Sequence, residues 1–124
     1  MESSYVINTK NKKISYEQKL FIKTSLRQLG INPKNNGFLL IQKAIILAYE
    51  KDMITINLEK IYKYLSNETE SISKSGIESL IRYSFYNINT KNLSNNYQKI
   101  FGIEFSIEFF NLRNLISDFL DILE

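Results

Sequence analysis

The sequence contains no cysteine and no histidine among its 124 residues. These absences exclude disulfide frameworks, thiol nucleophiles and imidazole bases, and they remove the usual ligands of zinc sites. The sequence also shows no glycine-rich phosphate loop and no nucleophile beside a base. We therefore expect that the protein is not an enzyme, and that it holds no metal and no cofactor.

Long apolar runs are also missing, because no stretch approaches the roughly 18 residues that a membrane span needs. The first thirty residues carry charged and polar groups instead of the apolar core of a secretion signal. Hydrophobic residues make up 44% and charged residues 23% of the chain, which is typical of one globular domain of this length. We expect a cytoplasmic protein with no membrane partner and no small-molecule substrate.

The formal net charge of +3 is unevenly distributed. Residues 1–34 hold seven Lys or Arg against two Glu, whereas residues 104–124 hold one Arg against five Asp or Glu. A basic excess of this size is compatible with nucleic acid, although lysines also simply solvate a surface. Residues 1–13 show no hydrophobic period, so we expect a flexible basic arm followed by a single helical domain at 14–124.

Apolar residues at helical spacing predict an all-α fold of about six helices. The first four are expected at Ser15 to Gly30, Phe38 to about Lys51, Asn57 to about Leu65, and Ser75 to Ile88. A capping-box pattern supports the start of the first helix, and the second is apolar almost all round, as a central buried helix would be. Gly37 lies in a turn-rich loop, where we expect a backbone conformation that other residues avoid.

The segment SKSGIESLIRYSF, residues 73–85, predicts an amphipathic helix with Ser73 or Ser75 as its cap. Glu78 and Arg82 lie one helical turn apart on its polar face. A short helix, a polar turn at 66–71 and this helix follow one another, and that order is typical of a helix-turn-helix whose second helix enters the major groove.

The remaining sequence predicts a polar loop at 87–96, a short helical turn that ends at Gly102, and a long C-terminal helix from about Ser106. From Phe105 onwards, apolar residues of this last helix follow at intervals of four, three, four, three and four, which is a heptad seam. The seam predicts either a face of the core or a dimer interface. The candidate interface residues are Phe109, Leu112, Ile116, Phe119 and Leu123.

Three segments in register resemble the C-terminal DNA-binding effector domain of the sporulation master response regulator, the stage 0 sporulation protein A family of endospore-forming Firmicutes. They are LGINPKNNGFLLIQKAIILAYEKD (29–52), SGIESLIRYSF (75–85) and IFGIEFS (100–106), which are similar to that family's opening loop and second helix, its recognition helix, and the segment after it. The resemblance covers about residues 15–124. It implies an all-helical domain that binds a short operator box, often as tandem dimers, here without the family's receiver domain.

The resemblance also implies roles for single residues, because Glu78 and Arg82 fall on the family's base-reading glutamate and arginine. A carboxylate accepts from cytosine and an arginine donates to guanine, each worth about 1–3 kcal/mol of discrimination. The other interpretation of this pair is an ordinary salt bridge worth about 0.3–0.5 kcal/mol. Further base contacts are expected from Ser79 and Tyr83. Expected phosphate contacts are Lys34, Asn35, Asn36, Lys74, Ser75 and Tyr86.

The predicted function is sequence-specific binding of double-stranded DNA by a small transcriptional regulator, which acts as a homodimer or as a heterodimer with a related regulator. The alternative is an interaction module without DNA affinity, which dimerises through the C-terminal helix and antagonises a related full-length regulator. Acidic residues near the reading face and the wide apolar stripe of the last helix motivate this alternative. The family's arginines have no counterpart at Gly76 and Ser79, which predicts weaker DNA binding, a different target sequence, or none.

Overall fold

The computed structural model describes residues 12–69 and 71–123, and within these ranges all regular structure is helical. The elements are α2 (Tyr16–Gln28), α3 (Asn36–Glu50), α4 (Leu58–Thr69), α5 (Lys74–Ser84), α6 (Thr90–Phe101), the short 3-10 helix η1 (Ile107–Phe109) and α7 (Leu112–Leu123). The predicted all-α fold with about six helices is thus confirmed. None of the described helices is long and apolar enough to cross a membrane.

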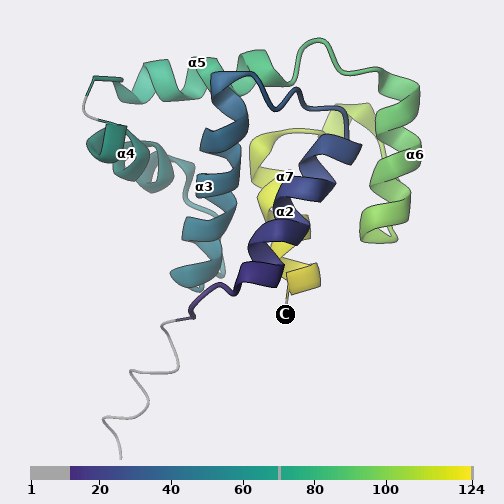
Figure 1. The fold of residues 1–124 in the computed structure, drawn as a ribbon, viewed down its shortest axis with the longest axis horizontal. Coiled ribbons are helices and arrows are strands. Elements are labelled where there is room, and N and C mark those ends of the chain that lie inside the picture. Colours follow the sequence, from purple (N-terminus) through teal and green to yellow (C-terminus); the bar gives the residue numbers. More distant parts are fainter. Residues whose placement is uncertain (1–11, 70, 124) are drawn as a thin grey trace, which may run out of the picture.

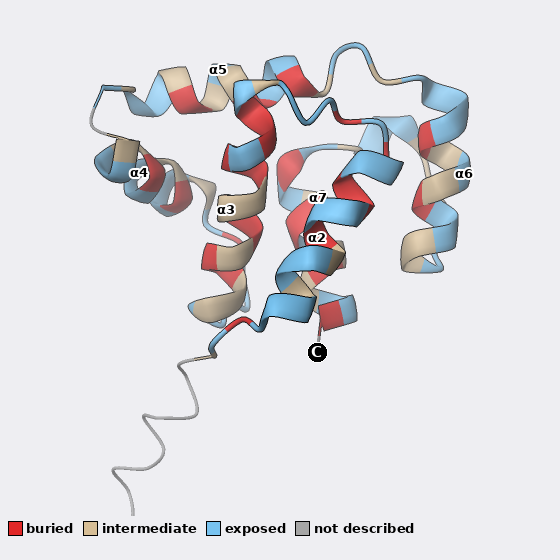
Figure 2. Cartoon of the chain, viewed as in Figure 1, coloured by how far each residue is buried: buried red, intermediate tan, exposed pale blue. Residues whose placement is uncertain are grey.

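Helix α3 is the centre of the fold and contacts α2, α4, α5 and α7. Figure 1 shows α5 lying across one end of α3, with α4 on one side of it and α2 and α7 on the other. Helix α6 packs outside α2 and α7. Figure 2 shows buried residues along the whole length of α3, which explains why its sequence is apolar almost all round.

Helices α3 and α5 approach each other closely at Gly37, in the first turn of α3. A Cβ at this position would lie 2.0 Å from Ser84 Oγ and 2.4 Å from the backbone oxygen of Leu80. Ser84 is 3% exposed, and its hydroxyl donates a hydrogen bond of 3.1 Å to that same Leu80 oxygen. Gly37 lies in helical backbone, so the expected unusual conformation is wrong. Glycine is needed here because α5 approaches so closely.

Helix α4 is longer than predicted, because residues 66–69 of the expected polar turn continue the helix. The Thr69 hydroxyl donates to the Leu65 carbonyl at 3.1 Å, and Ser66 Oγ donates to the Ile72 carbonyl at 2.6 Å. These polar side chains therefore bond to the helix and to the turn after it. Helix α5 has the predicted cap at Ser73, but it ends at Ser84, four residues before the predicted end.

The predicted polar loop at 87–96 is mostly helix, because α6 begins at Thr90. Asn89 caps α6, since its side-chain oxygen accepts from the Asn92 amide at 3.0 Å. Leu93 and Tyr97, four residues apart, are the residues of α6 that are buried. Gly102 ends the helix as predicted, with a left-handed φ of 69°.

The C-terminal helix is shorter than predicted, because η1 and an irregular segment separate Ser106 from the start of α7. Asn111 caps α7 by accepting from the Asn114 amide at 2.9 Å. The heptad seam is therefore interrupted. Four of the five predicted interface residues belong to the core of the single chain, because α7 packs against α3; they are Leu112, Ile116, Phe119 and Leu123. Each of these four residues is at most 8% exposed, and Phe109 alone of the five is exposed.

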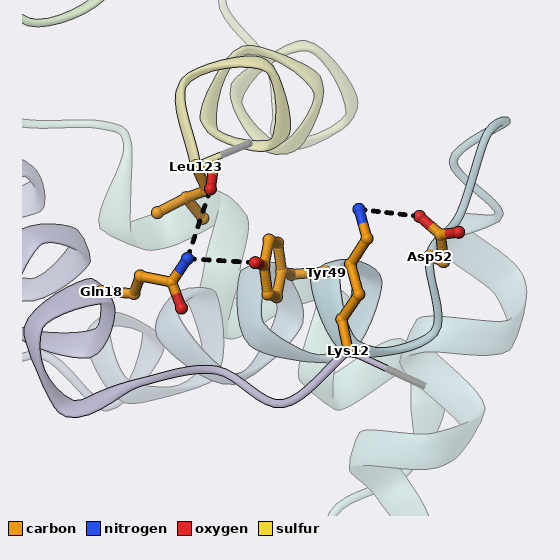
Figure 3. A network of polar contacts seen from close by, with 5 residues as sticks. All are labelled: Lys12, Gln18, Tyr49, Asp52 and Leu123. Carbon is orange, nitrogen blue, oxygen red and sulfur yellow. Dashed lines mark hydrogen bonds and ion pairs between the residues drawn. The ribbon is translucent and has the colours of Figure 1, made fainter. Parts of the chain in front are cut away.

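The residues just before α2 lie against the C-terminal end of α3 (Figure 3). Lys12 forms an ion pair of 3.0 Å with Asp52, and its ammonium lies 5.2 Å from the centre of the Tyr49 ring. The flexible arm at 1–13 stays a prediction, of which these contacts describe only Lys12. Residues 1–11 of that arm lie outside the described residues.

Gln18 connects three helices at the same end of the molecule. Its side-chain amide nitrogen donates to the Tyr49 hydroxyl at 3.0 Å and to the Leu123 carbonyl at 3.2 Å (Figure 3). Its side-chain oxygen accepts from the Ser15 amide at 2.8 Å, which completes the predicted capping box of α2. One glutamine therefore caps its own helix and joins it to α3 and α7.

Replacing Gly37 with alanine is expected to destabilise the protein by about 1–3 kcal/mol, because the new methyl group collides with α5 and overpacks the crossing. This loss outweighs the gain of up to about 1 kcal/mol that alanine brings in helix propensity. Urea unfolding followed by far-UV circular dichroism measures the difference. The matched control is Asn36→Ala at the exposed neighbouring position, where a Cβ is already present. Equal stability of the two variants would contradict the tight crossing.

Candidate nucleic-acid interface

Helix α5 has one side packed on the fold and one side open to solvent. Ile77, Ile81 and Ser84 are buried, and they repeat at the spacing of one helical face. The predicted base-reading residues share the opposite side, where Ser79, Arg82 and Tyr83 are exposed and Glu78 is half-buried. The structure therefore brings the four predicted base-reading residues together on one side of one helix.

The Glu78 and Arg82 side chains bond to each other. Arg82 Nη2 donates to Glu78 Oε2 at 2.7 Å, and the two side chains are 56% and 47% exposed. The ordinary salt bridge that the spacing predicts is thus present. Because both groups are exposed to solvent, such a pair contributes only about 0.3–0.5 kcal/mol to stability. A stronger partner can therefore displace either group.

The predicted phosphate-contacting residues on and after α5 have different surroundings. Lys74 pairs with Glu59 of α4, which connects the start of α5 to the helix before it. Ser75 is exposed in the first turn of α5. Tyr86 lies beyond the C-terminal end of α5, and its ring contacts Tyr83 edge-on, with centroids 6.4 Å apart. Lys74 is therefore the residue of this group whose charge is already offset.

A polar hollow of about 370 Å³ lies between the start of α3 and the end of α5, and Asn32, Asn35, Tyr83 and Asn87 contribute to its lining. Asn35 is the N-cap residue of α3, but its side chain makes no capping hydrogen bond there. Of the three predicted phosphate contacts at residues 34–36, Asn35 lines the hollow. Lys34 and Asn36 are exposed beside it in the chain.

A second hollow, of about 390 Å³, lies along the other flank of α5. Tyr62 of α4 and Arg113 of α7 line it together with Glu78 and Arg82. Arg113 Nη1 donates to the Ile56 carbonyl at 2.8 Å. Burial raises the pKa of the Tyr62 hydroxyl, and the charge of Glu78 raises it further, so this hydroxyl remains protonated and can donate.

Four residues beside α5 were not predicted from the sequence: Asn32, Tyr62, Asn87 and Arg113. Arg113 follows Arg82 by 31 positions and lies in a segment that the heptad seam assigned to dimerisation. No spacing rule connects residues so far apart, so their proximity follows from the packing of α4, α5 and α7. The exposed polar groups of the interface thus come from four parts of the chain.

Comparisons with models of known families, with curated proteins and with solved structures give no match to this chain. The resemblance to the sporulation regulator therefore stays a prediction, and the proposal below is based on the site itself.

Replacing Glu78 with glutamine is expected to change the free energy of unfolding by less than about 0.5 kcal/mol, because the pair with Arg82 is exposed on a single helix. Urea unfolding of the wild type and the variant at low and moderate salt measures this. A decrease of more than about 1 kcal/mol in the free energy of unfolding would show that the pair has a structural role and that Arg82 is not easily displaced from it.

Proposed function

We propose that the protein binds double-stranded DNA and acts as a small transcriptional regulator, with the outer side of α5 in the major groove. The observation that carries this proposal is the single exposed helix side that holds Glu78, Ser79, Arg82 and Tyr83. An α-helix fits the width of the major groove, and these side chains include donors and acceptors for base edges. The order of α4 and α5, with a short turn between them, also suits this function.

The flanks of α5 supply groups for the DNA backbone. The loop before α3 holds Lys34 and Asn35, and Asn36 begins α3. Asn35 lines the hollow at one end of α5, next to the amides of the first turn of α3. Backbone amides at a helix start and asparagine side chains are common phosphate ligands. Arg113 on the other flank adds a cation that the DNA backbone would attract.

Arg82 must exchange its bond to Glu78 for a bond to a base in order to read that base. The exposed bond to Glu78 contributes about 0.3–0.5 kcal/mol, whereas a bidentate contact to guanine contributes about 1–3 kcal/mol. Base contact is therefore favourable after the exchange. The released Glu78 carboxylate can then accept from a cytosine amine one helical turn away.

The test is fluorescence anisotropy of the purified protein with a random duplex pool at two salt concentrations, followed by sequencing of the bound fraction. We expect affinity to fall steeply as salt rises, together with an enriched short motif that contains a G·C pair. Absence of binding even at low salt would reject the proposal.

Arg82→Ala is expected to relax base preference at one position by about 1–3 kcal/mol while non-specific affinity changes little. Lys34→Ala serves as the matched variant, because the loss of one phosphate contact weakens all sequences alike and reduces the salt slope by about one. Both variants are compared by the same selection and anisotropy series. An unchanged sequence profile for Arg82→Ala would contradict this orientation of α5.

A second candidate function, protein interaction without DNA affinity, is favoured by Phe109, one of the residues predicted for it, and by two exposed isoleucines that were not predicted. Ile107 and Phe109 of η1 are 52% and 68% exposed, and Ile103 is 42% exposed. Ile103 and Phe109 line one hollow, and grouped apolar side chains mark a contact surface more often than scattered single residues do. Size-exclusion chromatography with light scattering distinguishes the two candidates, since a dimer that Phe109→Ser converts to monomer and that binds no duplex would support the second.

A further inference from the structure

A hollow of about 590 Å³ lies between the C-terminal end of α3 and the outer side of α4, and it is larger than either hollow beside α5. Lys51, Lys60 and Lys63 line it, together with the apolar side chains of Leu47 and Met53. Within the described part of the chain, none of these three lysines has a carboxylate at ion-pair distance. Their charges are therefore not offset at the site.

The position of these lysines separates the hollow from the proposed DNA interface. Lys60, Lys63 and Asn67 follow one another at three and four residues, so they share one side of α4. Leu58 and Tyr62, which line the hollow beside α5, lie on the opposite side by the same helical period. An occupant of this hollow is therefore separated from α5 by the width of α4.

The charge of the site favours a dianion. Three lysines that line one hollow carry like charges that repel one another, and the N-terminal end of α4 adds partial positive charge, because Asn57, its cap, also lines the hollow. A single carboxylate would leave most of this charge uncompensated. A phosphate monoester carries a charge of about −1.5 to −2 at neutral pH and has three acceptor oxygens.

The apolar part of the hollow favours an organic ligand over a free ion. Leu47 is almost completely buried, Met53 is half-buried, and Tyr64 is 44% exposed. A flat or aliphatic group bound against these side chains would remove apolar surface from water. The volume also lies within the range of roughly 300–1,000 Å³ that small-molecule sites occupy.

We propose that this hollow binds a small organic phosphate, with the phosphate between Lys51, Lys60 and Lys63 and the apolar part of the ligand against Leu47, Met53 and Tyr64. The site goes beyond the DNA-binding function and does not depend on it. Its position on α4, the helix that packs on α5, makes it a place where a ligand can influence the recognition helix.

The first test is a titration of the isotope-labelled full chain, followed by proton–nitrogen correlation NMR, with adenosine monophosphate, inorganic phosphate and adenosine as probes. We expect saturable shifts of amides in residues 47–67 with adenosine monophosphate, weaker shifts with inorganic phosphate and the weakest with adenosine. Shifts that do not saturate, or that spread over exposed lysines in general, would overturn the proposal and indicate non-specific charge attraction.

The matched variants separate this site from general basicity. Lys60→Gln combined with Lys63→Gln is expected to weaken adenosine monophosphate binding by about tenfold or more, because two charge-assisted hydrogen bonds are lost. Lys19→Gln combined with Lys23→Gln removes two exposed lysines from α2 with the same change in net charge, and it should leave the affinity unchanged. Equal loss in both double variants would overturn the site.

Duplex DNA distinguishes a free phosphate ester from the DNA backbone as the source of phosphate. If the hollow serves a small ligand, the Lys60 and Lys63 double variant binds duplex no more weakly than the α2 double variant. A larger loss of duplex affinity in the former, together with displacement of adenosine monophosphate by duplex, would assign these lysines to DNA and overturn the proposal. The NMR titration tests binding of adenosine monophosphate in the hollow even if the chain binds no DNA.

Discussion

The close crossing of α3 and α5 at Gly37 is the contact on which the candidate interface depends. Without a side chain at this position, the first turn of α3 lies directly against the Leu80 carbonyl and the Ser84 hydroxyl. The crossing fixes the rotation of α5 about its own axis, so Ile77 and Ile81 point inwards and Ser79 and Arg82 point outwards. It also places the loop before α3 beside the end of α5, where the polar hollow forms.

A chain of aromatic contacts supports the C-terminal end of α5 from the other half of the molecule. Consecutive ring centroids in this chain lie between 4.5 and 6.1 Å apart, in the order Phe85, Phe110, Tyr97, Phe101, Phe119 and Phe21. Tyr97 donates its hydroxyl to Asp118, and burial with this bond raises the pKa of Tyr97 far above its usual range. The acidic C-terminal region thus contributes to the position of α5 through packing.

Local patterns predicted what depends on neighbours in sequence, such as the capping box of Ser15 and Gln18, the amphipathic side of α5 and the stop at Gly102. They failed where contacts between residues far apart in the sequence determine the local structure. The asparagine-rich start of α6 resembles a loop, yet Leu93 and Tyr97 give it enough buried surface to be helical. Gly37 was singled out correctly for the wrong reason, because its constraint comes from residues 43 and 47 positions later.

The internal pairing of Arg82 bears on how sharply α5 would discriminate between DNA sequences. An arginine left without a partner at a wrong base would add a desolvation cost of about 1–3 kcal/mol to the mismatch. In the structure, Glu78 accepts from Arg82 at 2.7 Å, so under the proposed function a mismatched site would leave neither group unsatisfied. The cost of a mismatch is then mainly the lost base contact. Sequence preference in this interface should therefore depend on the sum of several modest contacts along α5 and its two flanks.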